Sequence, residues 1–319
     1  MHDDDIPSDP HLVRALIVDQ VPHLAALPVT PVVSSGTDNA MYRLGDRLAV
    51  RLPRRLEAVP LIAKEQRILP GLSGLPLAVP LPRHCGQPSV RFPYPFSVVD
   101  WIEGAPADLA HLSDPVVAAQ SLAAFLTALR GCGTQDGPIA GPANHNRGVP
   151  LSELCTVTRR CIDALADEID APRAHEMWQA ARDAAPHQGP PQWLHGDLKD
   201  DNLLARDGRL VAVIDWGLAA VGDPAIDLAV FWTWLEGDSA AAFRTATDLP
   251  PEAWDRARGW ALYGAVIALE YYRETADRPC RSAALCAISR RTLARLGLRH
   301  VHRPSPATKA STSDTERSR

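Results

Sequence analysis

Carboxylate and amide side chains are concentrated between residues 193 and 227 of the chain. Asp197, Asn202 and Asp215 are the three whose types could act together. A carboxylate can orient an attacking hydroxyl and accept its proton, while oxygen ligands can hold Mg²⁺ against nucleotide phosphates. This segment therefore contains each group that phosphoryl transfer requires.

The spacing of these residues follows a known pattern. Asp197 lies two residues after His195 and five before Asn202. This is the spacing of the kinase catalytic loop, in which the aspartate is the base and the asparagine is a Mg²⁺ ligand. Taken alone the spacing is a weak signal, because three fixed residue types occur by chance in a chain of this length at roughly the few-per-cent level.

The segment after Asn202 strengthens the interpretation because it predicts a β-hairpin. Apolar runs flank the turn-forming residues 206–209, and the second run ends at Asp215, which Trp216 and Gly217 follow. The hairpin would return Asp215 beside Asn202. An Asp-x-Gly after such a strand matches the kinase aspartate that chelates Mg²⁺. The alternative is an ordinary hairpin with turn-forming Asp and Asn.

These motifs resemble those of the aminoglycoside phosphotransferase family, whose members share the protein-kinase fold and carry H-G-D-x-x-x-x-N and I-D-W/F. The similarity extends from about residue 32 to residue 290. The resemblance implies that Asp197 is the catalytic base and that Asn202 and Asp215 are the metal ligands. It also implies ATP and Mg²⁺ as cofactors, with GTP not excluded.

Three neighbouring residues are assigned supporting roles, and a fourth, Lys199, is a candidate for binding the nucleotide. Asp223 and Asp227 match a family motif whose second aspartate braces the catalytic loop, although Asp223 also fits a helix N-cap before proline. In the kinase scheme His195 supports the loop, and we assign it no proton transfer. Lys199 could reach the γ-phosphate as a positive charge, or it could be a solvated loop lysine.

We expect the N-terminal part to bind the nucleotide. The loop that includes Ser35 and Gly36 lies where a phosphate-covering loop belongs, although it carries one glycine. In the strand predicted over 48–52, Arg51 stands where kinases place a lysine that contacts phosphates. Arginine can bridge phosphate oxygens bidentately, and we expect it to pair with Glu65. The alternatives are a surface arginine and a solvated glutamate.

The stretch 98–104, with Val99 and Trp101, resembles the hinge between kinase lobes, whose backbone groups bind the adenine edge. A plain interdomain linker would need the same residues. The acceptor should bind over the C-terminal part, where carboxylates could hold ammonium groups, although acids on helix surfaces are more often solvated. The candidate acceptor ligands are Glu236, Asp238, Glu270, Glu274 and Asp277. Tryptophans of this part are expected in the core rather than as sugar-stacking platforms.

The pattern of apolar residues changes near residue 100. After a polar leader, short apolar runs predict a β-rich lobe over 1–99 with strands at 40–44, 48–52 and 96–99 and one helix at 57–69. Residues 100–302 predict a hinge and a helical lobe, with helices at 115–130, 151–169, 172–185, 224–235 and 251–275. Residues 303–319 predict a disordered tail. Together with the resemblance, this indicates a bilobal, protein-kinase-like α+β fold.

Composition narrows the class of protein. The 319 residues are 46% hydrophobic and 22% charged, which predicts a folded chain of about two domains. A net charge of −5 argues against nucleic-acid binding and weakly favours cationic small molecules. The six cysteines form no C-x-x-C pair and predict reduced, buried thiols. We expect no signal peptide, no membrane partner, a cytoplasmic location and a monomer or homodimer.

The leading hypothesis is ATP-dependent O-phosphorylation of an aminoglycoside-type antibiotic, which would give resistance by modification. A macrolide, another antibiotic or a small metabolite such as an amino sugar or homoserine is the nearest alternative acceptor. Protein kinase activity ranks lower because no A-P-E segment follows Asp215. A nucleotide-binding pseudoenzyme is a further alternative, suggested by Arg51 and the glycine-poor loop.

Overall fold

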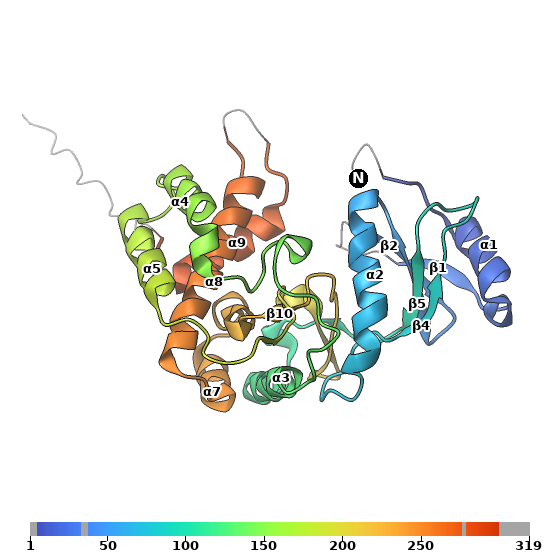
Figure 1. Cartoon of the computed structure of the whole chain (residues 1–319), viewed down its shortest axis with the longest axis horizontal. Coiled ribbons are helices and arrows are strands. Elements are labelled where there is room, and N and C mark those ends of the chain that lie inside the picture. The colour runs from blue at the N-terminus through green and yellow to red at the C-terminus, as the bar shows by residue number, and fades with distance from the viewer. Residues whose placement is uncertain (1–4, 33–37, 276–278, 300–319) are drawn as a thin grey trace, which may run out of the picture.

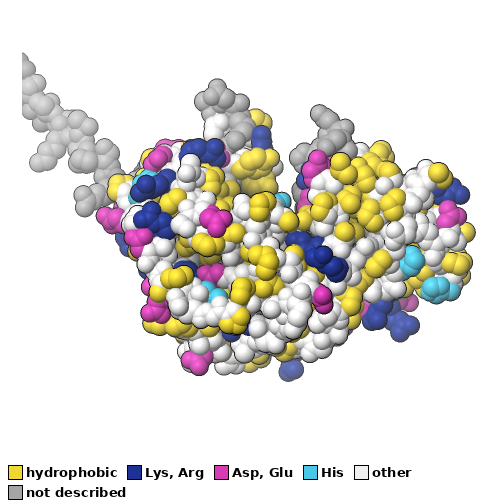
Figure 2. Space-filling view, in the orientation of Figure 1, with side chains coloured by type: hydrophobic (Ala, Val, Ile, Leu, Met, Phe, Trp, Pro, Cys, Tyr) yellow, Lys and Arg dark blue, Asp and Glu magenta, His cyan; other side chains and the backbone are white. Residues whose placement is uncertain are grey.

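The computed structural model describes residues 5–32, 38–275 and 279–299. These residues form a β-rich N-terminal part and a larger, mainly helical C-terminal part (Figure 1). This mixed architecture confirms the predicted α+β fold class. The predicted boundary at residues 99 and 100 falls within the last residues of a strand, β5. The space-filling view shows a notch between the two parts, with basic side chains where they meet (Figure 2).

The N-terminal part is built on a five-stranded antiparallel sheet of order β1-β2-β3-β5-β4. Its strands are β1 (Val29–Val32), β2 (Asn39–Leu44), β3 (Leu48–Pro53), β4 (Pro82–Gly86) and β5 (Phe96–Asp100). Strands β2, β3 and β5 confirm the prediction. The sequence did not indicate β4, because this edge strand is polar and mostly half-exposed and so lacks a continuous apolar face.

Two helices pack against this sheet. Helix α1 (Pro10–Gln20) covers one face, and α2 (Val59–Ile68) lies between the sheet and the helical part (Figure 1). The prediction of a polar leader was wrong for α1. Asp9 caps this helix by accepting the N–H of Leu12 at 2.7 Å, and its apolar residues recur at helical spacing in the core. The predicted helix over 57–69 is confirmed, with its first residues forming a 3₁₀ turn.

The C-terminal part contains most of the helices. They are α3 (Pro115–Arg130), α4 (Cys155–Ala164), α5 (Ala171–Asp183), α6 (Val230–Thr233), α7 (Gly237–Thr247), α8 (Pro251–Tyr272) and α9 (Ala283–Arg295). Helix α3 confirms its prediction, and Asp114 caps it. The predicted helices over 151–169 and 224–235 are shorter than expected, because each begins as a 3₁₀ turn and ends early. Helices α7 and α9 were not predicted; both are rich in small and polar residues.

Short strands position the loops of the C-terminal part. Strand β7 (Gln192–Leu194) pairs antiparallel with β10 (Ala220–Gly222). Strands β8 (Leu203–Arg206) and β9 (Arg209–Val213) form the predicted hairpin, and β6 (Ala105–Pro106) pairs with β8. The turn of this hairpin has positive φ at both Asp207 and Gly208. The segments that flank residues 195–202 and 214–219 are therefore held by sheet hydrogen bonds.

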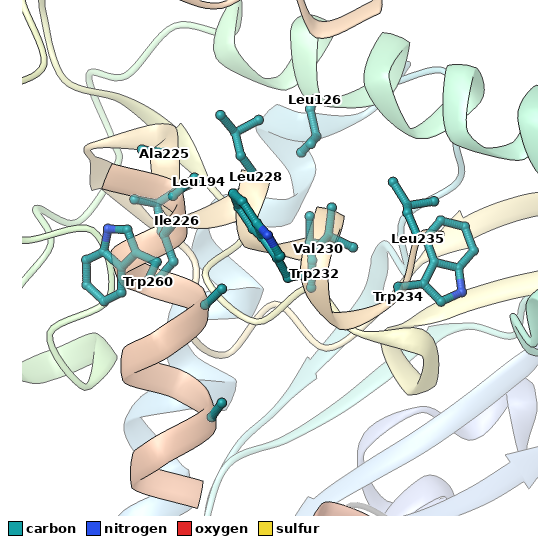
Figure 3. Packing of buried hydrophobic residues seen from close by; sticks show 14 of the residues in the cluster. Leu126, Leu194, Ala225, Ile226, Leu228, Val230, Trp232, Trp234, Leu235 and Trp260 are labelled. Carbon is teal, nitrogen blue, oxygen red and sulfur yellow. The ribbon is translucent and has the colours of Figure 1, made fainter. Parts of the chain in front are cut away.

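The core of the helical part is aromatic and aliphatic. Trp232, Trp234, Trp254 and Trp260 are all buried, which confirms the expectation that they belong to the core. Figure 3 shows Trp260 of α8 beside Leu194 and Ile226, so the long helix packs directly behind β7. This packing fixes the strand that leads into His195.

All six cysteines are free, but the prediction that they are buried was wrong for Cys85 and Cys280, which are exposed. Among the described residues, no helix is long and apolar enough to cross a bilayer. The loop residues Ser35 and Gly36, the acid Asp277 and the tail predicted over 303–319 all lie outside the described residues.

Candidate active site

The loop after β7 brings two of the predicted residues into direct contact. The side-chain Nδ2 of Asn202 donates hydrogen bonds to the backbone carbonyl of Asp197 at 2.8 Å and to its Oδ2 at 3.0 Å. Asn202 is buried, so its orientation is fixed by these two bonds. Because the NH₂ group is occupied by Asp197, the amide oxygen is the atom of Asn202 that remains for a metal ion.

The hairpin of β8 and β9 returns Asp215 to the same place, as predicted. The backbone N–H of Ile214 donates to the carbonyl of Asn202 at 2.9 Å, so Asp215 directly follows a residue hydrogen-bonded to Asn202. Asp215 has a φ of 65°, a left-handed conformation that a non-glycine residue adopts under constraint. Its side chain is half exposed, in contrast to the buried Asn202. The carboxylate is therefore open to a ligand.

The predicted pair on the N-terminal side is present. Nη1 of Arg51 lies 2.6 Å from Oε2 of Glu65, and the two residues are only 8% and 4% exposed. The other carboxylate oxygen of Glu65 accepts the N–H of Trp216 at 2.9 Å. Nη2 of Arg51 lies 4.0 Å from Oδ1 of Asp215. Glu65 therefore links strand β3 through helix α2 to the segment that carries Asp215.

Burial governs the charge state of this pair. Although burial lowers the pKa of Arg51, the charges of Glu65 and Asp215 raise it above its ordinary value, so the guanidinium stays protonated. Burial raises the pKa of the Glu65 carboxyl, and the charge of Arg51 opposes that rise. The ionised form of Glu65 thus depends on Arg51, which makes the pair a single unit.

Lys199 lies against the candidate base. Its Nζ is 3.2 Å from Oδ2 of Asp197. Burial lowers the pKa of Lys199, but the charges of Asp197 and Asp215 outweigh burial and raise that pKa above its ordinary value. Lys199 is therefore a fixed positive charge beside two carboxylates, which fits the proposed role at a phosphate better than a solvated lysine does.

Buried contacts support the loop from behind. The two carboxylate oxygens of Asp227 accept the backbone N–H groups of His195 at 2.7 Å and Gly196 at 2.8 Å. Burial raises the pKa of Asp227, while His195 and these two N–H groups lower it. Gly196 has a φ of 82°, and a Cβ there would lie 2.9 Å from the carbonyl oxygen of Leu218, so only glycine fits. These contacts match the bracing role expected of Asp227.

The hydrogen bonds of His195 determine its tautomer. Nε2 lies 3.0 Å from the carbonyl of Ile214, and Nδ1 accepts the N–H of Asp197 at 3.3 Å. Since a carbonyl only accepts, Nε2 is the nitrogen that donates and Nδ1 the one that accepts. His195 also packs edge-on against Trp216 with ring centroids 4.8 Å apart. These contacts match a supporting role.

Asp223 has the N-cap role that the sequence indicated, because its Oδ1 accepts the N–H of Ala225 at 3.0 Å. The sequence did not show its second role. Asp223 also forms an ion pair with Arg256 of α8, whose Nε lies 2.6 Å from Oδ2. This pair joins the segment after β10 to the long helix α8.

Two residues of the predicted hinge, Val99 and Trp101, were expected to bind the nucleotide. The backbone N–H of Trp101 donates to the carbonyl of Arg47 at 2.8 Å, and contact of the hinge with an adenine ring stays a prediction. Arg43 stacks on the Trp101 ring with its guanidinium carbon 4.8 Å from the centroid. Val99 is buried in β5 between β3 and β4. Contact of Val99 with the nucleotide stays a prediction.

The predicted acceptor acids do not form one cluster around Asp197. Glu236 pairs with Arg295 of α9 at 2.7 Å, and Asp238 is exposed in the first turn of α7. Glu270 lies close enough to Cys161 of α4 to raise the pKa of that thiol, after burial as the main cause. Glu274 is exposed just beyond the end of α8. Within the described residues, no group of three His, Cys, Asp or Glu side chains forms a metal site.

Three further residues at this site were not selected from the sequence: Lys64, Asn144 and Arg147. Lys64 is buried, and its Nζ lies 3.4 Å from the carbonyl of Ala143 and 3.3 Å from that of Ala219. Asn144 and Arg147 belong to the loop between α3 and α4, which the sequence indicated only as a linker. The one signal in the sequence was the unusual run Asn144–Gly148, N-H-N-R-G.

Comparison with known proteins agrees with this geometry. Residues 30–260 match the model of the phosphotransferase enzyme family. The chain belongs to this family. An aminoglycoside 3'-phosphotransferase of Escherichia coli is 32% identical over 125 residues, which cover 38% of this chain and 44% of that protein. A viomycin phosphotransferase of Streptomyces vinaceus is 31% identical over 199 residues, covering 58% of this chain and 67% of that protein. The matched region therefore spans less than half of the length of the first relative.

Solved structures of related enzymes share the fold of this phosphotransferase family member. The GDP complex of an aminoglycoside 2'-phosphotransferase-IIIa superposes with a TM-score of 0.64 at 18% identity, covering 91% of this chain and 99% of that chain. A macrolide 2'-phosphotransferase from Brachybacterium faecium superposes with a TM-score of 0.56 at 23% identity, covering 90% and 98%. These likenesses confirm the predicted bilobal, protein-kinase-like fold.

Proposed function

We propose that this protein is an ATP-dependent phosphotransferase that moves the γ-phosphate of ATP to a hydroxyl group of a small molecule. The observation that carries the proposal is the convergence of Asp197, Asn202 and Asp215 through direct hydrogen bonds of the loop and the hairpin. Asp197 orients the acceptor hydroxyl and takes its proton as the new oxygen–phosphorus bond forms and the bond to ADP breaks.

The residues present fit Mg²⁺. The free amide oxygen of Asn202 and the half-exposed carboxylate of Asp215 are hard oxygen donors, and Mg²⁺ characteristically takes few protein ligands together with phosphate and water oxygens. When bound, the ion would neutralise negative charge on the phosphates. The protein itself contributes by holding the Asn202 amide oxygen and the Asp215 carboxylate in fixed positions.

The cationic side chains have separate tasks in this proposal. Arg51, fixed by Glu65, faces the nucleotide phosphates from the N-terminal side. Lys199 approaches from the catalytic loop, where its Nζ lies 3.2 Å from Asp197 and its positive charge can stabilise charge on the transferred group. GTP is a second candidate donor, because the first structural relative was solved as a GDP complex.

The names of the relatives make antibiotics the first acceptors to test. The curated relatives are named for an aminoglycoside and for viomycin, and one structural relative is named for macrolides. An aminoglycoside-type antibiotic is therefore the leading candidate from relationship, with a macrolide or a small hydroxylated metabolite as the alternative. Modification of an antibiotic would confer resistance to it.

The experiment is to follow ADP and GDP release from the Mg²⁺-nucleotides across aminoglycosides, viomycin, macrolides, amino sugars and hydroxy acids, with Asp197→Asn as the matched control. Acceptor-dependent release that is abolished in the control supports the proposal and names the substrate class. Tight ATP binding without transfer to any acceptor in this panel would instead favour a nucleotide-binding pseudoenzyme.

A further inference from the structure

The loop between α3 and α4 holds Arg147 in place at the cost of backbone strain. His145 and Asn146 have φ values of 54° and 58°, a left-handed conformation that is unfavourable for both. Asn144, which is buried, donates to the carbonyls of Arg147 at 2.8 Å and Leu218 at 3.1 Å. These hydrogen bonds attach the loop to the segment that follows Asp215 and fix the backbone of Arg147.

Arg147 lies directly beside the catalytic loop. Its Cβ would be 3.2 Å from a Cβ placed on Gly196, the residue before Asp197. Its guanidinium carbon lies 5.6 Å from the ring centroid of Tyr263 on α8. The side chain therefore extends from beside the catalytic loop, next to the residue that precedes Asp197, toward α8.

The charge of Arg147 has no counterion among the described residues. Its Nε is buried without a hydrogen-bond partner, and within residues 5–32, 38–275 and 279–299 the guanidinium forms no ion pair. By contrast, the buried Arg51 and Arg256 each form a close ion pair. A buried N–H donor without an acceptor is unfavourable, so the Nε of Arg147 and the constrained loop that holds it point to a partner supplied by a ligand.

A second unpaired donor belongs to Trp260, whose ring contacts that of Tyr263. Trp260 is 2% exposed, and its Nε1 has no hydrogen-bond partner among the described residues. The rings of Trp260 and Tyr263 are 5.6 Å apart and nearly perpendicular. Buried N–H donors require acceptor oxygens, and an arginine selects an anionic oxygen group over a neutral one.

Two acids of the helical part are already paired. Arg291 of α9 lies 3.8 Å from Asp200, and Arg295 lies 2.7 Å from Glu236. An ammonium group of an acceptor would have to compete with these arginines for the two carboxylates. Arg147 would in addition repel such a group. The charge arrangement therefore disfavours a polycationic acceptor at this position.

We propose that Arg147, together with the Tyr263 ring, forms an acceptor subsite for a carboxylate, so that the preferred acceptor is a hydroxylated molecule that also carries this anionic group. The inference rests on the proposed function, because only a phosphotransferase would bind an acceptor here. It disfavours aminoglycosides as acceptors. Binding at this subsite requires no phosphoryl transfer, so it can be measured separately from turnover.

The test follows the arginine Nε–H signals of ¹⁵N-arginine-labelled protein by NMR, with the Arg147 signal assigned by its loss in Arg147→Gln. The Asp197→Asn protein serves as a non-reacting host. It is titrated with 4-hydroxybutanoate and, separately, with butane-1,4-diol, which lacks the carboxylate. Arg244 is the matched control, because it also stacks on an aromatic ring, 4.9 Å from the centroid of Trp254.

A saturable shift of the Arg147 signal with the hydroxy acid but not with the diol, and no shift of Arg244, is the expected result. No response of Arg147 up to about 50 mM hydroxy acid overturns the proposal, since a fragment contact of this kind should bind in the millimolar range. A shift produced by Mg²⁺-ATP alone also overturns it, because the anion would then be a nucleotide phosphate.

Kinetics give the second readout. For the acceptor that supports the fastest ADP release, Arg147→Gln should raise the acceptor KM by about tenfold or more and leave the KM for ATP unchanged, whereas Arg244→Gln changes neither. Efficient turnover of an aminoglycoside with a KM insensitive to Arg147→Gln would refute the subsite while leaving the kinase proposal intact. If no acceptor supports ADP release while the hydroxy acid still shifts the Arg147 signal, the kinase proposal is refuted and the subsite is not.

Discussion

The nucleotide side and the acceptor side of the candidate site differ in how their charged groups are satisfied. On the nucleotide side, Arg51, Glu65 and Lys199 each have a protein partner within 3.2 Å. On the acceptor side, Arg147 forms no ion pair among the described residues, its Nε has no hydrogen-bond partner, and its guanidinium lies over the Tyr263 ring. A group that is already paired has its position set by folding, whereas an unpaired group depends on the ligand. Substitutions on the two sides should therefore affect different measured quantities.

The largest effect should come from Asp197→Asn. The amide cannot take the proton of the acceptor hydroxyl, so kcat should fall by about 10²- to 10⁴-fold. The hydrogen bond from Asn202 to the backbone carbonyl of residue 197 does not depend on the carboxylate and should preserve the loop. Calorimetric ATP binding should therefore be retained. A variant with more than about a tenth of the wild-type kcat would show that the base lies elsewhere.

Glu65→Gln tests whether the nucleotide side depends on its ion pair. The amide can still accept the backbone N–H of Trp216, but it removes the 2.6 Å ion pair of Arg51, which then faces the more distant carboxylate of Asp215. We expect the free energy of unfolding to fall by about 3 kcal/mol and kcat/KM for ATP to fall by about 10- to 100-fold. Chemical denaturation and initial rates measure the two effects. Glu57→Gln, at an exposed position near the start of α2, is the control and should change neither.

Arg51→Lys addresses the departure from the usual kinase lysine. The substitution keeps the positive charge but removes the planar fork that contacts Glu65 and faces Asp215. We expect a smaller loss than for Glu65→Gln, with the KM for ATP raised by about tenfold and the KM for the acceptor unchanged. An unchanged KM for ATP would mean that this position requires charge alone. A raised acceptor KM would contradict the division between the two sides.

The smallest effect concerns Lys64 and appears in stability. Burial is the main cause that lowers the pKa of Lys64 from 10.5 to about 8. The unfolded chain therefore binds this proton more tightly than the folded protein. Between these two pKa values the unfolded state carries more protons, so the contribution of Lys64 to the free energy of unfolding rises with pH.

Lys64→Met removes this dependence. Compared with the variant, the wild-type protein should gain about 1 kcal/mol of stability between pH 7 and pH 9. Urea unfolding at the two pH values measures the difference. Arg209→Met, at an exposed position in β9, provides the control for the loss of one positive charge. Equal pH dependence in wild type and Lys64→Met would show that Lys64 keeps its ordinary pKa.

The parts of the site that the sequence predicted are those set by local spacing. Asp197 and Asn202 are five residues apart, and a short hairpin delivers Asp215, so a motif and a turn were enough to place all three together. The pair of Arg51 and Glu65 was also predicted, because the kinase pattern pairs the cation of this strand with a glutamate of the helix that follows.

The remaining residues could not be predicted because their partners lie far away in the chain. Lys64 reaches the carbonyl of Ala219, 155 residues later, and Asn144 reaches that of Leu218, 74 residues later. The spacing of apolar residues does not indicate contacts over such distances in the chain. The sequence placed Lys64 in a predicted helix and Asn144 in a linker. The same limitation applies to the candidate acceptor acid Glu236. Its partner Arg295 lies on α9, a helix that the sequence did not reveal.

Helix α2 belongs by sequence to the N-terminal part but is attached to the other part. Glu65 holds the N–H of Trp216, Lys64 approaches the carbonyl of Ala219, and Leu61 lies next to Gly217. In engineered hybrids of family members, a junction at residue 100 would pair a foreign α2 with the native segment 215–219 and misplace Asp215. The unit of exchange between relatives is therefore α2 together with residues 215–219, and not the N-terminal lobe by itself.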